Sequence, residues 1–188
     1  MSFFEKLMLS KQISFNEGKI SLLGQRFVIL PADSLIYYVL TIDKNVKFIS
    51  KLYNSAKQTV AKGFGVDVGR NYSFSFGDYT NWFVEIAKFG GWGIIKWKEL
   101  EKESHKGVIS IENSPFGVSL KGKVNSPCDH IIRGLIAGGA SSAFKSDVDV
   151  IETECIATGS TKCILAIDSN ENLKLKYPKL YETQLMPK

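Results

Sequence analysis

The closing segment of the chain restricts how its last two strands can fold. Residues 152–163 read "ETECIATGSTKC", in which a glycine turn at Gly159 separates an apolar-alternating stretch from the run "KCILAI". This pattern predicts an antiparallel hairpin in which Cys155 lies directly opposite Cys163. Side chains opposed in this way have Cβ atoms about 4.5–5.5 Å apart on one face, so two thiolates could share one ion.

A helix is predicted just upstream of this hairpin. Ser126 and Pro127 suit the cap and the first helical position, and the helix that they open would direct Cys128 inward from its first turn. The positive end of the helix dipole favours a thiolate there. Gly134 and Gly138 lie one turn apart on the same helix, which indicates close backbone packing or a thin wall beside a cavity.

Glu152 offers an oxygen donor to the same site. It lies an odd number of positions before Cys155, so the two side chains would face opposite sides of a regular strand. We therefore predict a β-bulge near residues 151–153 that brings them to one face. His130 is a rival fourth ligand, but two residues beyond Cys128 on a helix it points away from it.

Two alternatives remain open for the cysteines. Free cysteine is among the most buried residue types, so all three could be ordinary core residues. A redox disulfide between Cys155 and Cys163 is the other reading. The count of three cysteines, with no secretory signal at the N-terminus, argues against a disulfide framework and predicts a cytoplasmic protein.

Composition and charge narrow the functional classes. The chain has 188 residues, 44% of them hydrophobic, which suits the core of one domain. Its net charge is +5, but only Arg26, Arg70 and Arg133 are arginines and the lysines are scattered, so we expect no nucleic-acid partner. The apolar runs fall far short of the ~20 residues that a membrane span needs, so we expect no membrane association.

The remaining pattern predicts an α+β fold with a mainly antiparallel small sheet packed with helices. A hairpin turns at Glu17-Gly18, and the later strands are "IIKWKEL" and "GVISIEN". Helices are predicted from Pro31, from about Asn45 and from near Asp78. The C-terminal stretch "KLKYPKLYETQLMPK" is expected to be a surface strand or tail.

The segment from Cys128 to Ile167 resembles the 4-vinyl reductase domain family, in its helix "CDHIIRGLIAGG", its E-x-x-C element and its closing G-x-x-x-C. The stretches "GGWGIIKW", "ISIENSPFG", "GQRFVILP" and "LYNSAKQTVAKGFG" are also similar to that family. The likeness runs from about Gly24 to Ile167. It predicts an N-terminal extension over 1–23, a 4-vinyl reductase-like domain over 24–170 and a C-terminal tail over 171–188.

The resemblance implies a fold shared with the sensory domain of phenol-responsive transcription activators and with small TRAPP subunits, commonly as a homodimer. In the aromatic-sensing relatives this element and a cysteine at the preceding helix hold zinc. The implied ligands here are Cys128, Glu152, Cys155 and Cys163. Four protein ligands leave no open coordination position, so such a site would be structural. Iron in place of zinc stays open.

No dinucleotide fingerprint or nucleophile elbow occurs in the sequence, so we do not expect an enzyme. We expect instead a sensor or carrier of a small hydrophobic or aromatic molecule, which would pass its signal to a separate effector protein. Trp82, Phe83, Trp92 and Trp97 are candidates to line an apolar pocket, although ordinary core packing is the commoner role of such residues. The alternative is a protein-interaction or assembly subunit with a purely structural metal and no small ligand.

Overall fold

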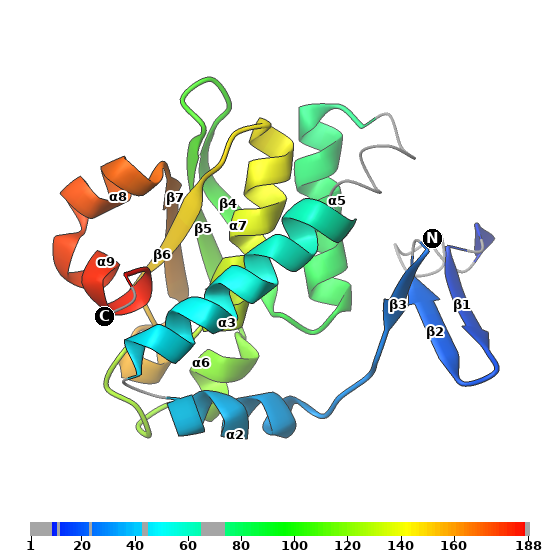
Figure 1. Cartoon of the computed structure of the whole chain (residues 1–188), viewed down its shortest axis with the longest axis horizontal. Coiled ribbons are helices and arrows are strands. Elements are labelled where there is room, and N and C mark those ends of the chain that lie inside the picture. Colours follow the sequence, from blue (N-terminus) through cyan, green and yellow to red (C-terminus); the bar gives the residue numbers. More distant parts are fainter. Residues whose placement is uncertain (1–8, 11, 23, 43–44, 65–73, 187–188) are drawn as a thin grey trace. The chain divides into compact units, whose positions relative to one another are not determined.

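The computed structural model describes residues 9–10, 12–22, 24–42, 45–64 and 74–186 (Figure 1). The chain divides into two compact units, Met1–Leu35 and Ile36–Lys188, which are considered separately below. Among the described residues, no helix is both long and apolar enough to cross a membrane.

The first unit contains a three-stranded antiparallel sheet in the order β1-β2-β3. The strands are β1 (Ile13–Asn16), β2 (Lys19–Leu22) and β3 (Gln25–Phe27). The turn between β1 and β2 consists of Glu17 and Gly18, both with positive φ (47° and 71°), which is the geometry of a tight two-residue hairpin. The predicted turn at this position is therefore confirmed.

The helices of the chain begin where the sequence signals indicate. Helix α2 (Ala32–Ile42) directly follows Pro31. Helix α3 (Val46–Gln58) is capped by the side chain of Asn45 and continues as a π-helical turn, η1 (Thr59–Phe64). Helix α5 (Phe76–Phe89) starts with a capping box between Ser75 and Asp78 and ends at the glycines before Trp92. These three predictions are confirmed to within a few residues.

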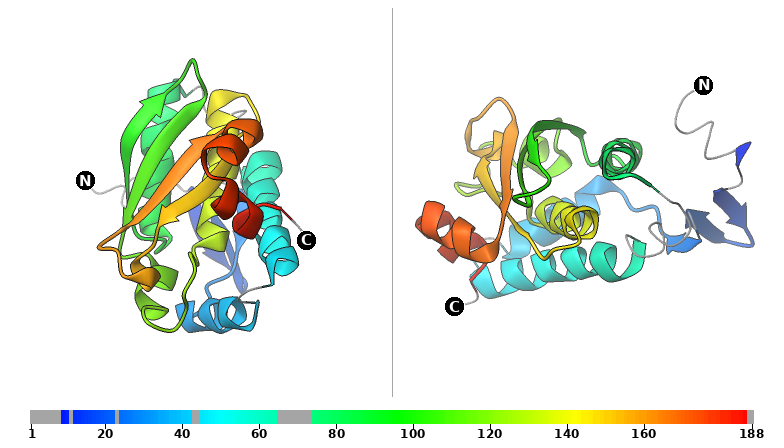
Figure 2. Two further views of the ribbon diagram at one scale, coloured as in Figure 1. Left: turned by 90° about the vertical axis from the view of Figure 1, so that its left-hand side faces the viewer. Right: turned by 90° about the horizontal axis from the view of Figure 1, so that it is seen from above.

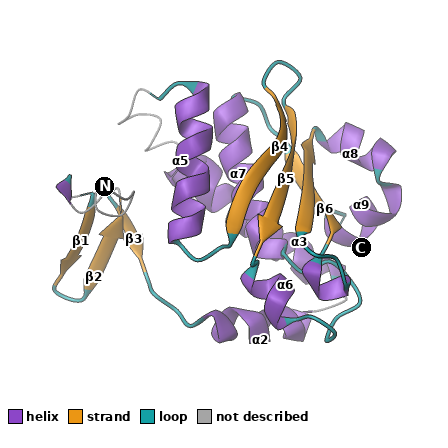
Figure 3. Cartoon of the chain, turned by 180° about the vertical axis from the view of Figure 1, so that it is seen from behind, coloured by secondary structure: helices purple, strands orange, loops and turns teal. Residues whose placement is uncertain are grey.

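The second unit is built on a four-stranded antiparallel sheet in the order β4-β5-β7-β6 (Figure 3). The strands are β4 (Ile94–Glu101), β5 (Lys106–Glu112), β6 (Asp149–Glu154) and β7 (Cys163–Asp168). A short helix, α6 (Pro115–Ser119), follows β5, and α7 (His130–Phe144) precedes β6. Two antiparallel sheets with helices confirm the predicted α+β fold.

Helix α7 lies between the four-stranded sheet and α3, with α5 beside it (Figure 2). Its contact with α3 depends on two glycines. A Cβ atom at Gly134 would overlap the main-chain oxygen of Tyr53, and one at Gly138 would overlap that of Lys57. The predicted close backbone packing of this helix is confirmed.

Three local predictions are wrong. Helix α7 begins at His130, not at Ser126, because the residues before it are used in contacts with the sheet described below. The strands of the last hairpin stop short of Cys155, and a 3₁₀ turn, η2 (Ile156–Thr158), replaces the expected continuation around Gly159.

The third wrong prediction concerns the C-terminal stretch. It forms two helices, α8 (Asn170–Lys176) and α9 (Pro178–Gln184), not a surface strand or tail. They dock on β6 and β7 because Leu173 and Tyr181 pack with Ile151 and Ala166 in a small core of their own.

Candidate metal centre

Three donors converge between the end of β6 and the start of β7. A carboxylate oxygen of Glu152 and the sulfurs of Cys155 and Cys163 all lie within 4.8 Å of one another. All three residues are fully buried. Such a separation lets one ion contact the three side chains at ordinary metal–ligand distances of about 2.0–2.3 Å.

A bulge in β6 makes this convergence possible. Glu152 pairs with Leu165 across the hairpin, whereas Glu154 pairs with Ile164, so Thr153 is an extra residue on its strand. The bulge predicted near residues 151–153 is thereby confirmed. It turns Glu152 and Cys155 to the same side although they are an odd number of positions apart.

Cys163 is held in place at the start of β7. Its sulfur accepts a hydrogen bond from the main-chain N–H of Ile156 in the 3₁₀ turn, at 3.4 Å. The Ile156 amide is available because the turn, and not a continued strand, follows Cys155. The departure from a regular hairpin thus provides a donor for a cysteine sulfur.

Cys128 approaches the group from the turn before α7. Its sulfur lies 3.7 Å from that of Cys155, and both cysteines are buried. Cys128 is not a member of the three-residue group in which all donor atoms are mutually close. Of the four side chains considered from sequence, the structure therefore brings three together and places Cys128 at their edge.

Asp129 is a second residue at this edge, and the sequence analysis missed it. It is fully buried, its Oδ1 accepts a hydrogen bond from the Ser114 hydroxyl, and its main-chain N–H donates to Oε2 of Glu152 at 3.0 Å. The other carboxyl oxygens, Oδ2 of Asp129 and Oε1 of Glu152, have no hydrogen-bond partner among the described residues. Two buried carboxyl oxygens without donors beside three sulfurs form a donor set suited to a cation.

The ionisation of these groups follows from burial and from each other's charge. Burial raises the pKa of Glu152 well above its usual range, and the neighbouring Asp129 adds to the effect. Burial also raises the pKa of Asp129, to about 6, against the hydrogen bond from Ser114. Hydrogen bonds from the Cys128 and Cys163 thiols lower the pKa of Cys155, which marks Cys155 as the most thiolate-like of the three cysteines.

His130 is turned toward other partners. Its Nδ1 lies 3.3 Å from a terminal nitrogen of Arg133, one turn along α7. Burial lowers the pKa of His130 to about 3, and the positive charge of Arg133 lowers it further. The structure places the imidazole with Arg133 and not in the three-residue donor group.

Residues 108–168, which carry every donor just described, match the family model of the 4-vinyl reductase domain, abbreviated V-4-R. The chain contains a 4-vinyl reductase domain. The resemblance to this family is thereby confirmed for this part of the chain. A search of curated proteins finds no match.

Solved structures extend the likeness of fold beyond the 4-vinyl reductase domain. The phenol-responsive sensory domain of the transcription activator PoxR, solved with phenol, has a TM-score of 0.75 and 14% identity over 96% of this chain and 98% of that one. A vinyl-4-reductase family protein from Methanocaldococcus jannaschii gives 0.51 and 20% identity over 76% and 83%. A trafficking protein particle complex subunit 3 from Naegleria fowleri, bound covalently to palmitic acid, gives 0.50 and 14% over 73% and 89%. At these identities the likeness shows the fold alone.

The 4-vinyl reductase domain also contributes to a small cavity between α5, α7 and β4. The cavity measures about 10 Å³, about enough for one water molecule. Its lining residues are Tyr79, Thr80, Phe83, Trp97, Ile136, Gly139, Ala140 and Ala143. Of the four aromatic residues considered from sequence, the structure places Phe83 and Trp97 at this cavity.

The other two aromatic candidates lie elsewhere. Trp82 is on α5 with its ring 6.1 Å from those of Phe74 and Tyr79, and Trp92 lies after α5 with its ring 6.4 Å from that of Phe116. Their spacing from Phe83 and Trp97 in the sequence gave no means of separating the two pairs.

Two polar atoms of the cavity lining are buried without a hydrogen bond to any described residue. They are the hydroxyl oxygen of Tyr79 and the indole nitrogen of Trp97. The Ser142 hydroxyl, which lies near Tyr79 and partly offsets the rise that burial causes in its pKa, donates to the main chain of Gly138 at 3.0 Å. Tyr79 is a residue that sequence analysis missed, because nothing in its spacing distinguishes it from a core tyrosine.

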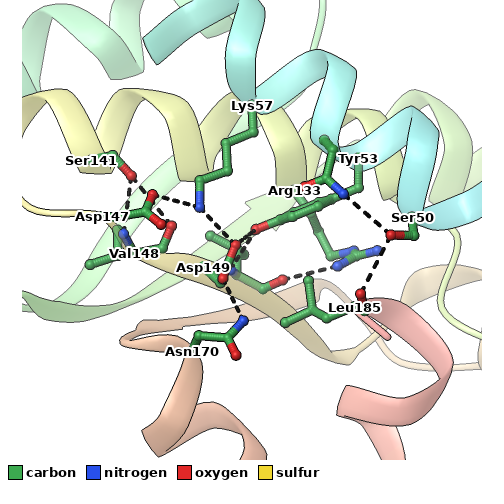
Figure 4. A network of polar contacts seen from close by, with 12 residues as sticks. Ser50, Tyr53, Lys57, Arg133, Ser141, Asp147, Val148, Asp149, Asn170 and Leu185 are labelled. Atoms are coloured by element: carbon green, nitrogen blue, oxygen red, sulfur yellow. Dashed lines mark hydrogen bonds and ion pairs between the residues drawn. The ribbon is translucent and has the colours of Figure 1, made fainter. Parts of the chain in front are cut away.

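A buried polar network joins the 4-vinyl reductase domain to α3 and to the C-terminal helices (Figure 4). The Tyr53 hydroxyl donates to Oδ1 of Asp149 at 2.7 Å and accepts from the main-chain N–H of Val150 at 3.0 Å. Lys57 contacts the same carboxylate at 2.9 Å, and the Asn170 amide donates to its other oxygen at 2.7 Å. Asp149 thus links β6 to α3 and α8 at once.

Arg133 is the buried cation of this region. Its guanidinium donates to the main-chain oxygens of Val150 (2.9 Å) and Gln184 (3.3 Å), and lies 4.8 Å over the ring of Tyr53. Its side chain is fully buried. A lone arginine in the apolar helix "CDHIIRGLIAGG" was a sequence signal for such a role, because arginine is rarely buried without partners.

Proposed function

We propose that this chain is a sensory or carrier domain for a small aromatic or hydrophobic molecule, with a structural metal ion that pins its last hairpin to the start of α7. The observation that carries the ligand proposal is the pair of polar atoms at an apolar cavity that lack a partner among the described residues, the Tyr79 hydroxyl and the Trp97 indole N–H. Apolar walls with a few convergent polar groups are how sites for small ligands are built.

A phenol-like ligand suits these atoms. Its ring would occupy the space lined by Phe83 and by the small residues of α7, and its hydroxyl would accept from the Trp97 indole and exchange a hydrogen bond with Tyr79. The solved PoxR sensory domain binds phenol. The cavity of about 10 Å³ must enlarge to admit any ring, so binding requires side chains of α5 or β4 to move.

The metal part of the proposal is supported by the buried donor set. We expect zinc, bound by Glu152, Cys155 and Cys163, with the fourth ligand from the turn before α7, for which the sequence prediction is Cys128. A closed site of this kind supplies folding free energy and no chemistry. Its role would be to fix the N-terminal end of α7, the helix whose other face lines the cavity.

A thermal-shift titration tests the ligand proposal. Phenol and cresols should raise the melting temperature in proportion to ligand binding, and toluene should do so less because it cannot satisfy Tyr79 and Trp97. Trp97→Phe should remove the preference for phenol over toluene. The matched control is Trp92→Phe, which changes the same residue type away from the cavity and should keep the preference.

The outcome also distinguishes the assembly alternative. The cavity's small volume is the observation that favours that alternative, because a filled interior has no room for a ligand. No stabilisation by any aromatic compound, with a complex recovered at stoichiometric amounts from a cell extract, would contradict the sensor proposal. The homodimer, the cytoplasmic location and the effector protein remain predictions, and sedimentation equilibrium tests the first of these.

A further inference from the structure

The three-residue donor group needs a fourth ligand, and two neighbouring residues compete for that position. Cys128 and Asp129 both lie in the turn before α7, and neither belongs to the group whose donor atoms are all within 4.8 Å of one another. One of them must move inward to close the site. Which one does so decides whether the ion has three sulfur ligands or two.

We infer that Asp129, and not Cys128, supplies the fourth ligand through its Oδ2 atom. This assignment rests on the proposed metal centre and specifies its coordination. It would give a site of two sulfurs and two carboxylate oxygens.

The first argument is that Asp129 already faces the site with a free acceptor. Its side chain is fully buried, and Oδ2 has no hydrogen-bond partner in the described part of the chain. The Cys163 thiol lies within hydrogen-bonding reach of this carboxyl group. A buried carboxyl oxygen without a donor is costly unless a cation compensates for it.

The second argument is that Asp129 is positioned by its other polar atoms. Ser114 Oγ donates to Oδ1, and that hydroxyl is itself fixed at the N-terminus of α6, where it accepts from the main-chain N–H of Gly117 at 3.1 Å. The main-chain N–H of Asp129 donates to Oε2 of Glu152 at 3.0 Å. Metal-binding carboxylates are commonly oriented by such hydrogen bonds.

The third argument concerns the available positive charge. Arg133 is the buried cation nearest these carboxyl groups in the described network, but it donates to the main chains of Val150 and Gln184 and contacts His130. Its charge therefore acts on Asp129 only at a distance. Cys128, in contrast, is a small apolar side chain that tolerates burial without a partner and already has the sulfur of Cys155 at 3.7 Å.

Cobalt substitution distinguishes the two coordination sets. The reduced, metal-free protein is titrated with Co²⁺ alone, and its absorption is followed in the thiolate-to-cobalt charge-transfer and d–d regions, with affinity measured by chelator competition. Cys128→Ser should keep the charge-transfer intensity and stay close to wild-type affinity. Asp129→Ala should lower affinity by more than the roughly 10–100-fold that loss of an outer-shell partner costs.

A gain-of-signal variant guards against the loss of folding in Asp129→Ala. Asp129→Cys places a thiolate at the proposed ligand position, so its cobalt complex should show a stronger charge-transfer band than wild type, because a third sulfur then reaches the ion. Cys128→Ala serves as the matched control and should leave the band unchanged. Circular dichroism of each apo variant checks that the fold is retained.

The results separate the assignment from the metal centre itself. A Cys128→Ser protein with reduced charge-transfer intensity and weakened binding, beside an unaffected Asp129→Ala protein, would overturn the assignment and leave the metal centre intact. An unchanged band in folded Asp129→Cys would also overturn it. Wild-type protein that binds neither Co²⁺ nor Zn²⁺ would overturn the metal centre and the assignment together.

Discussion

The side-chain amide of Gln184 is bonded to both main-chain polar groups of Glu152. The Glu152 N–H donates to Oε1 of Gln184 at 2.9 Å, and Nε2 of Gln184 donates to the Glu152 carbonyl at 2.8 Å. Because β6 is an edge strand of the described sheet, these groups face away from β7 and have no strand there to pair with. One residue of α9 thus completes the hydrogen bonding of the strand that carries a candidate ligand.

Gln184→Ala should destabilise the protein by about 1–3 kcal/mol, because it leaves a buried N–H and a buried carbonyl unpaired. Urea denaturation followed by circular dichroism measures this. Thr183→Ala, in the same helix but at an exposed position, should change the unfolding free energy by less than about 0.5 kcal/mol. Equal effects of the two substitutions would contradict this role of Gln184.

Cys155→Ser should strongly reduce the metal content of protein purified under reducing conditions. Cys155 is the residue through which Cys128, Cys163 and Glu152 are all connected, and a hydroxyl is a much poorer ligand than a thiolate for zinc. Elemental analysis by mass spectrometry gives the metal-to-protein ratio and identifies zinc or iron. An unchanged ratio would remove Cys155 from the ligand set.

Gly138→Ala should cost about 1–3 kcal/mol, because the new methyl group would overlap the Lys57 carbonyl and force α7 away from α3. Gly77→Ala is the matched control. It also lies in a helix, but a Cβ atom there meets no described atom within 4 Å, so stability should be unchanged or slightly raised. Thermal denaturation of both variants compares the two effects.

Stability should fall at acidic pH through Asp149. Burial opposes its charge, but hydrogen bonds from Lys57, Asn170 and Tyr53 outweigh burial and lower its pKa. A folded-state pKa below the unfolded value of about 3.9 stabilises the protein above that pH, and the contribution disappears as pH falls through the lowered folded pKa. Asp149→Asn should therefore be less stable at neutral pH, with a difference that narrows toward about pH 2.

Asp147→Asn provides the control for this pH dependence. Its carboxylate contacts the same Lys57 at 2.8 Å, but 83% of its side chain is exposed, so solvent screens the interaction. Urea denaturation at a series of pH values should give nearly parallel curves for this variant and wild type. A constant difference between Asp149→Asn and wild type down to about pH 2 would contradict the assigned role of Asp149.

Much of the fold was predictable because its signals are local. The caps at Asn45 and Ser75 and the turn at Glu17 and Gly18 each depend on a few neighbouring residues. Even the bulge at Thr153 followed from the sequence, since two donors at odd spacing could share one face only with an extra residue between them. Local backbone rules were sufficient in each case.

The failures concern features that depend on distant contacts. The C-terminal helices dock on a strand edge, and no local signal marks Gln184 as the residue that pairs with it. Helix α7 starts only at His130 because the Asp129 amide donates to Glu152, 23 positions away, and does not serve a helix cap. Asp129 escaped attention because the neighbouring Cys128 is the more familiar ligand type.

Helix α7 has glycines on two faces. Gly134 and Gly138 admit the backbone of α3, while a Cβ atom at Gly139 would overlap the Phe83 ring of α5. On the α3 side the nearest atoms belong to the main chain, which cannot rotate aside to create space. The Phe83 side, in contrast, is closed by a ring that can turn about its own bonds. A guest molecule must therefore enter by displacing α5 side chains, with α7 serving as the fixed wall against which it is measured.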